Sequence, residues 1–318
     1  TTSSLHVENP QTEMKTNNSQ QSPPRLVIIG AAGRLGGAML ESYSKRHRVI
    51  GLTRAELDLA NPESIRRALE PLEYDRLILP GALTAVDYCE AHEDEAFAIN
   101  ADGPKLIAEI SAQKGAHVTY ISTDFVFGGL SERAYSEERV PKPLSVYGAS
   151  KLEGEENMLG VSQHNLVARV SWLYGSGKPA FPEWIIQQAM KQTALALPEE
   201  KIGSPTYTAD VVDYLELLLG LDRGAPAGGI YHLSNSGQCT WQQWGQFCLD
   251  QAAAAGLPLK TRTIAANCLE DITAFVAKRP INSVLCTEKF TRHTGIVPRS
   301  WPEAMREHFA KTLVAACR

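Results

Sequence analysis

The chain has 318 residues, a formal net charge of −5 at pH 7 and a sequence pI of 5.9. This acidic balance argues against nucleic acid or an anionic membrane as the main partner, because both are bound through an excess of lysine and arginine. Apolar residues make up 43% and charged residues 21% of the chain, as in ordinary globular proteins. No apolar run reaches the roughly 18 residues that a membrane-spanning helix needs, so no membrane partner is expected.

The six cysteines show neither a Cys-x-x-Cys pair nor a metal-ligand spacing with histidine. In a chain of this size, the pattern is typical of reduced thiols and predicts a cytoplasmic location. The eight histidines are scattered, and no metal site is predicted from them.

From residue 25 onwards, short apolar runs alternate with helical patterns. Helices are expected at 35–46, from Pro62 and at 94–112, and the strands between them are predicted at 25–29, 48–52, 76–79, 117–121 and 166–170. Continuous apolar strands are typical of a parallel sheet that is buried on both faces. The predicted fold class is therefore α/β, with a doubly wound parallel sheet and right-handed crossovers.

The composition changes after the fifth strand. Trp172, Tyr174 and Phe181 interrupt the regular alternation, which predicts a smaller α/β lobe that shapes a substrate pocket. Core packing is expected instead for Trp184, Trp241 and Trp244. A helix at 210–219, a strand at 229–233 and a helix at 241–255 follow. The predicted organisation is a disordered leader at 1–24, a dinucleotide-binding domain at 25–170 to which 205–235 returns, and a substrate-binding lobe at 171–204 and 236–318.

Gly30, Gly33 and Gly36 follow the first strand directly and open the first helix. Glycines there let the backbone approach a pyrophosphate, and the N–H groups and dipole of a helix N-terminus favour an anion. The alternative is a tight turn without a ligand. The strand–turn–helix context favours a dinucleotide site of the Rossmann type.

The second strand is followed by Thr53 and Arg54, and Arg34 lies in the first glycine turn. An NAD site would be expected to place an acidic residue near the end of this strand, for the ribose 2′-hydroxyl. A hydroxyl and two guanidiniums suit a 2′-phosphate better, so NADP is the predicted cofactor and NAD the alternative. Either arginine could instead only cap the surface.

Tyr147 and Lys151 are four residues apart in a predicted helix, so their side chains share one face. An ammonium beside a tyrosine lowers the phenol pKa from its ordinary value of about 10. The phenol can then give a proton to a carbonyl oxygen while hydride reaches the carbon. Thr123, where the fourth strand ends, can donate a hydrogen bond to the same oxygen. The alternatives are a surface Tyr–Lys pair and a hydroxyl that bonds only local backbone.

These motifs, together with longer ones, resemble the dTDP-4-dehydrorhamnose reductase family of the extended short-chain dehydrogenase/reductases over nearly the whole chain after residue 25. The longer motifs are 84–87 (TAVD), 122–127 (STDFVF), 143–148 (PLSVYG), 169–175 (RVSWLYG), 203–210 (GSPTYTAD) and 279–285 (RPINSVL). The resemblance implies reduction of the 4-keto group of dTDP-4-dehydro-β-L-rhamnose to give dTDP-L-rhamnose, with NADPH or NADH.

The resemblance also implies site residues. Thr123, Tyr147 and Lys151 would be catalytic, and Trp172 would pack on the sugar. The full substrate-binding prediction is Val86, Thr123, Asp124, Phe125, Tyr147 and Trp172. The full cofactor-binding prediction is Gly30, Ala32, Gly33, Arg34, Leu35, Gly36, Thr53, Arg54, Asp58, Leu59, Gly81, Ala82, Leu83, Thr84, Tyr147 and Lys151.

Some family members bind Mg²⁺ through glutamates at a dimer interface. Ala38 stands where one of those glutamates would be, so no metal is predicted, whereas a homodimer remains an expectation. One alternative function is a cofactor-binding regulatory subunit, as in the related β subunit of methionine adenosyltransferase. Another is a reductase or epimerase of a different nucleotide sugar. The intact Thr123, Tyr147 and Lys151 favour an enzyme.

Overall fold

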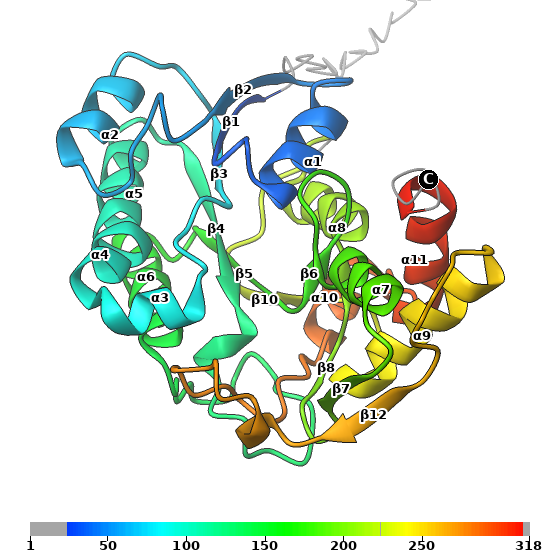
Figure 1. Cartoon of the computed structure of the whole chain (residues 1–318). Coiled ribbons are helices and arrows are strands. Elements are labelled where there is room, and N and C mark those ends of the chain that lie inside the picture. The colour runs from blue at the N-terminus through cyan, green and yellow to red at the C-terminus, as the bar shows by residue number, and fades with distance from the viewer. Residues whose placement is uncertain (1–23, 223, 314–318) are drawn as a thin grey trace, which may run out of the picture.

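A six-stranded parallel sheet forms the centre of the structure, a computed structural model that describes residues 24–222 and 224–313 (Figure 1). Its strands run in the order β10-β5-β4-β3-β1-β2, and each neighbouring pair is parallel. They are β1 (Arg25–Ile29), β2 (Arg48–Leu52), β3 (Arg76–Leu79), β4 (His117–Thr123), β5 (Leu166–Val170) and β10 (Gly229–Leu233). All six coincide with predicted strands, and β4 runs two residues further than predicted. The leader predicted at 1–24 lies outside the described residues, apart from Pro24.

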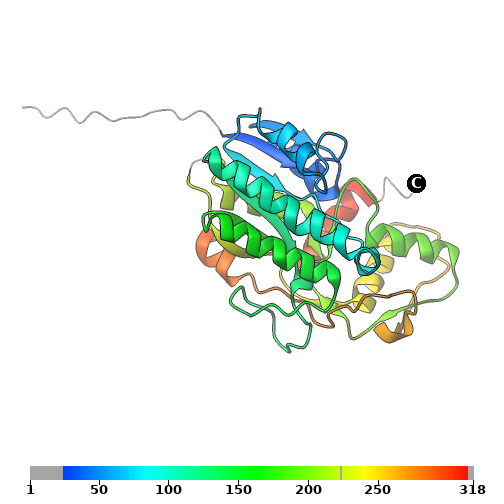
Figure 2. The same ribbon diagram turned by 90° about the vertical axis from the view of Figure 1, so that its left-hand side faces the viewer.

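Helices cover both faces of the sheet, as Figures 1 and 2 show. One face packs against α2, α5 and α6 through Ile65, Ile107 and Met158, and the other against α1 and α8 through Met39 and Leu215. The doubly wound α/β prediction is therefore confirmed. The helices of this part are α1 (Arg34–Tyr43), α2 (Pro62–Leu69), α3 (Val86–Ala91), α4 (Glu93–Phe97), α5 (Gly103–Gln113), α6 (Val146–Val161) and α8 (Thr208–Leu219).

Two helix predictions need correction. The helix predicted at 35–46 ends at Tyr43, and turns follow it. The helix predicted at 94–112 is a run of α4, the π-helical turn η1 (Ala98–Asp102) and α5. Hydrophobic periodicity marked the run, but it could not show where the hydrogen-bond spacing changes.

A second lobe lies beside the sheet, on the right of Figure 1. Its core includes Ile185, Leu197, Trp244 and Met305. Its main elements are α7 (Phe181–Lys191), α9 (Trp241–Ala254), α11 (Trp301–His308) and the paired strands β7 (Leu195–Pro198) with β12 (Ile264–Asn267), β8 (Ile202–Gly203) with β11 (Cys239–Thr240), and β6 (Leu173–Tyr174) with β9 (Thr206–Tyr207). The short helices are η2 (Asp124–Val126), η3 (Leu269–Asp271), α10 (Glu288–Thr294) and η4 (Phe309–Leu313).

The predicted core role holds for buried Trp244 and for Trp241, which packs against the same cluster, but it is wrong for Trp184, whose exposed fraction is 47%. The division of the chain into domains remains a prediction. Within the described ranges, no helix combines the length and the apolar character that a membrane span requires.

A buried ion pair fastens α6 to the sheet. Arg169 on β5 donates from Nη2 to Glu155 Oε2 (2.6 Å) and from Nε to Glu155 Oε1 (2.9 Å), and both side chains are about fully buried. Ser122 on β4 also donates to Glu155. Arg169 Nη1 also lies 3.4 Å from Nε2 of His232 on β10. Burial, together with the Arg169 charge, lowers the pKa of His232 to about 3. The imidazole therefore stays neutral, and the pair joins α6, β4, β5 and β10.

We expect Glu155→Gln to lower the free energy of unfolding by about 3–5 kcal/mol, because it leaves the Arg169 guanidinium buried without its carboxylate. Urea unfolding at pH 7, followed by circular dichroism, measures the loss. The matched control is Glu70→Gln, which breaks the exposed Arg66–Glu70 pair (3.4 Å) and should cost less than about 1 kcal/mol. An equal decrease in the free energy of unfolding in the two variants would show that the buried pair stabilises the fold no more than the exposed one.

Candidate active site

The glycine turn lies where the strand order reverses, with β2 on one side of β1 and β3 on the other. Gly30 has φ +94°, and a Cβ there would be 2.7 Å from the backbone of Gly81 in the loop after β3. A Cβ on Gly36 would be 2.3 Å from the Gly30 carbonyl oxygen. Both glycines are therefore required by backbone packing. Ligands of open α/β sheets bind beyond the carboxyl ends of the strands at such a reversal.

The start of α1 is suited to a pyrophosphate. Its N-cap residue is Gly33, and no described side chain caps the helix there. The first-turn N–H groups, which include those of Arg34, Leu35 and Gly36, are the donors that a helix cannot satisfy internally. Unpaired N–H groups and the helix dipole attract an anion. The predicted glycine turn therefore fits a dinucleotide.

Arg34 has a structural role that the sequence did not predict. Its Nη2 donates to the carbonyls of Lys178 (3.0 Å) and Pro179 (2.7 Å), and its Nη1 donates to Leu173 (3.3 Å). The guanidinium thus ties α1 to the segment after β6. These contacts occupy donors that were predicted to bind a 2′-phosphate, so that prediction now depends chiefly on Thr53 and Arg54.

The end of β2 carries a carboxylate that the sequence analysis missed. Thr53 donates to Glu56 from its backbone N (2.6 Å) and from Oγ1 (2.8 Å), and these bonds lower the pKa of Glu56. Arg54 is exposed, with Nε 4.0 Å from an Asp58 oxygen. An NAD site was expected to have an acidic residue near the end of this strand, and the turn that folds Glu56 back onto Thr53 places one there. The segment after β2 therefore carries both a basic side chain, Arg54, and an acidic one, Glu56.

A buried asparagine fixes the loop after β3. Asn100, in the π-helical turn, accepts from Leu83 N (2.9 Å) and donates to Leu83 O (3.0 Å) and to Ser150 Oγ on α6 (3.0 Å). Its own carbonyl accepts from the Tyr120 hydroxyl (2.6 Å). Sequence reasoning missed Asn100, although an asparagine inside an apolar helical pattern was a signal. The contacts hold the predicted cofactor loop, which comprises Gly81, Ala82, Leu83 and Thr84, against α6. Leu59 lies against the start of α5, where a Cβ on Gly103 would be 2.3 Å from the Leu59 carbonyl oxygen.

The structure places Thr123 at the carboxyl end of β4, and Tyr147 and Lys151 in the first turns of α6. Ser145 caps α6 by accepting from Gly148 N (3.2 Å), which sets Tyr147 in the first turn. The Tyr147 and Thr123 side chains are both buried, and the Thr123 hydroxyl is near enough to the phenol to lower its pKa. Lys151 Nζ donates to the Ile121 carbonyl (2.7 Å) and lies 3.8 Å from the Tyr120 ring centroid.

Burial sets the proton affinities of this group. It raises the pKa of Tyr147, although the bond from Thr123 opposes the change, and it lowers the pKa of Lys151 to about 7, against the pull of Glu155. The expectation that Lys151 lowers the phenol pKa is therefore wrong for this structure, because the ammonium binds Ile121 instead. Tyr147 is a neutral phenol at neutral pH, the form that can donate a proton.

Aromatic and apolar side chains line the other side of Tyr147. Phe125 meets it edge to face at a centroid distance of 5.5 Å, and Val86 packs in the same cluster. Trp172 has the strained φ of +43° and stacks on Trp244 at 5.4 Å. A Cβ on Gly203 would be 2.3 Å from the Trp172 ring, which explains the glycine of the GSPT motif.

Asp124, predicted to bind substrate, is buried and already bonded. It accepts from Thr123 Oγ1 (3.1 Å) and from Ser171 Oγ (3.1 Å). Nearby lies Lys201, fully buried, which the sequence analysis missed because nothing in its local pattern predicts burial.

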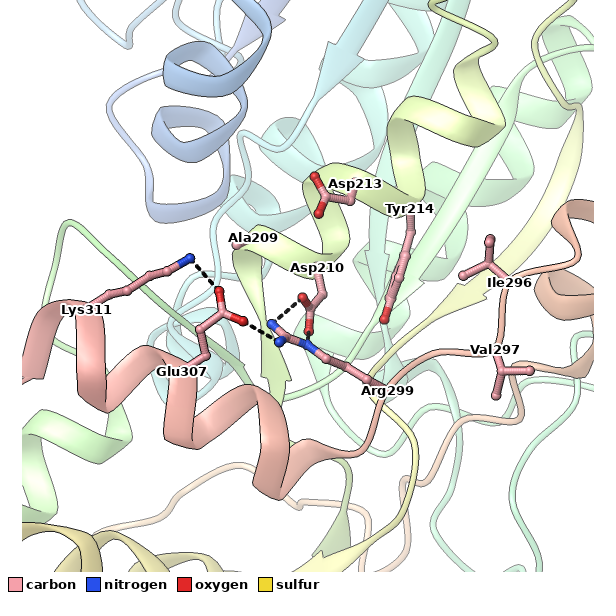
Figure 3. A pocket seen from close by; sticks show the side chains of 9 residues that line it. All are labelled: Ala209, Asp210, Asp213, Tyr214, Ile296, Val297, Arg299, Glu307 and Lys311. Atoms are coloured by element: carbon pink, nitrogen blue, oxygen red, sulfur yellow. Dashed lines mark hydrogen bonds and ion pairs between the residues drawn. The ribbon is translucent and has the colours of Figure 1, made fainter.

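Within the described part of the chain, two other features involve none of the predicted site residues. A cavity of about 400 Å³ is lined by Asp210, Arg299, Glu307 and Lys311, whose charges pair with one another (Figure 3). The structure also brings ligand atoms of His47, Glu216 and Asp222 within 4.8 Å of one another, a grouping that the sequence did not predict. Arg46 already pairs with Glu216 (2.5 Å) and Asp222 (3.7 Å).

The parallel sheet with helices on both faces is a Rossmann-type α/β fold, the fold of the dTDP-4-dehydrorhamnose reductases that superimpose on it. More specifically, the chain belongs to the family described as the RmlD substrate binding domain, whose model matches residues 24–314.

Curated relatives cover most of the chain. The spore coat polysaccharide biosynthesis protein SpsK of Bacillus subtilis is 33% identical over 285 residues, 89% of this chain and 96% of the relative. The dTDP-4-dehydrorhamnose reductase of Sinorhizobium fredii is 31% identical, over 89% of this chain and 95% of its own. Among solved structures, the Bacillus anthracis dTDP-4-dehydrorhamnose reductase in complex with NADP superimposes with a TM-score of 0.84 and 29% identity, over 92% of this chain and 100% of that chain.

The depressed pKa of Lys151 makes stability depend on pH. The folded chain holds this lysine with a pKa of about 7, against an ordinary value of 10.5, so between these values the unfolded chain binds more protons. The stability of the wild type should therefore rise with pH relative to Lys151→Met, by at most about 1.4 kcal/mol per pH unit. Urea unfolding of both proteins from pH 7 to 10 measures this. Parallel curves would contradict the depressed pKa.

Proposed function

We propose that this chain is an NADPH-dependent reductase of a 4-keto nucleotide sugar, with dTDP-4-dehydro-β-L-rhamnose as substrate and dTDP-L-rhamnose as product. The observation that carries the proposal is the buried Thr123–Tyr147 contact beside Lys151, at the carboxyl end of β4 and next to Phe125. The choice of substrate is supported by relatives that are described as dTDP-4-dehydrorhamnose reductases. A neutral phenol among apolar side chains is the proton donor that a carbonyl reduction needs.

The cofactor, when bound, supplies a hydride to the keto carbon. Tyr147 gives its proton to the keto oxygen as that oxygen becomes an alkoxide, so the carbonyl is converted to an alcohol. The raised pKa of Tyr147 keeps this proton in place at neutral pH. Lys151 would hold the nicotinamide ribose. Without substrate, the Thr123 hydroxyl donates to Asp124 Oδ1 (3.1 Å). Its proposed task with substrate bound is to turn and donate to the keto oxygen that Tyr147 protonates.

Removing the phenol oxygen tests the chemistry. Tyr147→Phe should keep its fold and its cofactor affinity but lose turnover by about 10²–10⁴-fold, the usual contribution of a general acid. NADPH oxidation is followed with dTDP-4-dehydrorhamnose and a panel of other 4-keto nucleotide sugars. Tyr74→Phe, which removes a buried phenol oxygen bonded to Ser111 Oγ (3.0 Å), serves as the control and should retain the wild-type kcat.

Three outcomes separate the candidates. Wild-type turnover by Tyr147→Phe would refute the mechanism. Turnover confined to a different keto sugar would favour the reductase of another nucleotide sugar, and one relative, 32% identical, is described as a probable dTDP-4,6-dihydroxy-2-methyloxan-3-one 4-ketoreductase. Tight NADPH binding by a wild type that reduces nothing would favour the regulatory subunit.

Cofactor choice depends on the charges that follow β2. Arg54→Ala should weaken NADPH by about tenfold or more, because a charge-assisted contact to the 2′-phosphate contributes roughly 1.5–3 kcal/mol. Glu56→Gln should strengthen NADPH, since it removes a carboxylate beside the same phosphate. Fluorescence titration measures both, with NADH as the control ligand that lacks the phosphate. Equal affinity of the wild type for NADH and NADPH would overturn the NADP preference.

The cytoplasmic location and the homodimer remain predictions.

A further inference from the structure

A segment without helix or strand, residues 272–281, reaches from the second lobe to α3, and the mechanism above does not use it. It follows η3, and Figure 1 shows it in orange, running from the side of β12 towards α3. Within it, Val276 and Lys278 are exposed, whereas Ala277 is buried between them. Residues 272–281 are called the strap below.

One carboxylate, that of Asp87 in the first turn of α3, holds the strap. Asp87 Oδ1 accepts from the backbone N of Val276 (2.8 Å) and of Ala277 (2.9 Å). Arg279 donates from Nη1 to Oδ1 (3.1 Å) and from Nη2 to Oδ2 (2.6 Å), a two-point contact of the strong, charge-assisted kind. Within the described part of the chain, every hydrogen bond that residues 276–279 make outside the strap goes to this carboxylate.

The α3 end of the ion pair lies beside the proposed proton donor. Val86 directly precedes Asp87 and packs in one apolar cluster with Tyr147 and Phe125. Val86 and Phe125 are both predicted substrate contacts. A change in what holds α3 would therefore reach a wall of the site.

The strap end of the ion pair lies beside the aromatic wall of the predicted sugar pocket. The Arg279 guanidinium lies 3.5 Å from the ring centroid of Phe275, and an aromatic face attracts a cation at this distance. Phe275 meets Trp241 edge to face at 6.1 Å, and Trp241 lies 6.1 Å from Trp172. The ion pair thus joins the part of the chain that carries the phenol to the lobe that carries Trp172.

We propose that Asp87 and Arg279 are positioning residues for the reduction: their ion pair holds the strap across the sugar pocket and sets both of its walls before the nucleotide sugar binds. This inference rests on the proposed function. A segment that is already ordered saves the ligand the free energy of ordering it. A pocket that is closed only part of the time binds its ligand with an affinity reduced by the closed fraction.

Asp87→Asn tests the ion pair, because it keeps the shape of the side chain and one carbonyl oxygen but removes the charge. We expect KM for the keto nucleotide sugar to rise about tenfold, as for a strap that is closed about one tenth of the time, with kcat little changed. The affinity for NADPH should stay at the wild-type value.

Asp75→Asn is the matched control. Asp75 also accepts from a backbone N, that of Arg25 (2.8 Å), and pairs with a guanidinium at two points (both 3.1 Å), but it does so at the amino end of β1, away from the site. This variant should keep the wild-type KM.

Trypsin cleavage after Lys278 gives a second readout, which needs no turnover. Lys278 is exposed, but its neighbours Ala277 and Arg279 are bonded to Asp87, so a protease gains access only when the strap opens. Asp87→Asn should be cleaved there at least about tenfold faster than the wild type, because cleavage follows the population of the open form. Asp75→Asn should be cleaved like the wild type, and dTDP-L-rhamnose should slow the cleavage. Mass spectrometry of the fragments identifies the site.

A double variant separates the ion pair from the packing of each side chain. In Asp87→Asn/Arg279→Met, KM should rise by less than the product of the two single effects, because either change already breaks the pair. Should Arg279→Met not fold, Arg279→Lys, which keeps the charge but not the two-point contact, replaces it in the same comparison.

The inference would be overturned by a wild-type KM or an unchanged rate of cleavage after Lys278 in Asp87→Asn, or by single effects that multiply in the double variant. Cleavage that dTDP-L-rhamnose does not slow in an active wild type would also overturn it. A wild type that reduces no keto sugar would instead overturn the proposed function, and the cleavage rates would still decide whether Asp87 holds the strap.

Discussion

The buried pair of Glu155 and Arg169 is the constraint on which the site depends. Glu155 lies one turn after Lys151 on α6, and Arg169 lies on β5, so the pair fixes the helix that carries Tyr147 against the sheet. Ser122, one residue before Thr123, bonds the same carboxylate. The positions of the proton donor and of its hydroxyl partner are therefore set together. Removing one partner would leave the other buried without its opposite charge.

Burial then determines the chemistry of the site. The same desolvation that raises the pKa of the Tyr147 phenol lowers the pKa of Lys151, because in each case the charged form loses hydration. The pair therefore favours a neutral phenol over the ion pair expected from the helical spacing. Asp124, whose pKa burial raises, and Lys201, whose pKa burial lowers, follow the same rule.

Local pattern was sufficient wherever one segment defines its own structure. Sheet strands were predicted because short apolar runs between turns, such as that of β1, are typical of strands in a buried parallel sheet. The GxxGxxG turn could be predicted because its three glycines lie within one short segment. Asn100 and Glu56 were missed, because each matters through a contact that a turn or a neighbouring helix creates. Arg34 was assigned to a phosphate, whereas the structure places carbonyls of the segment after β6 around its guanidinium.

By itself, the sequence determined the fold class, the family and the residue types at the ends of β1, β4 and α6, because periodicity, glycine spacing and motif order are properties of neighbouring residues. Only the tertiary structure decided which of those side chains are charged and what each one touches. Lys151 turned to the Ile121 carbonyl, and Lys201 became buried with its Nζ donating to the carbonyl of Pro280, a residue distant in the sequence. Proton affinities depend on desolvation and on charges that are distant in sequence, and both exist only once the chain has folded.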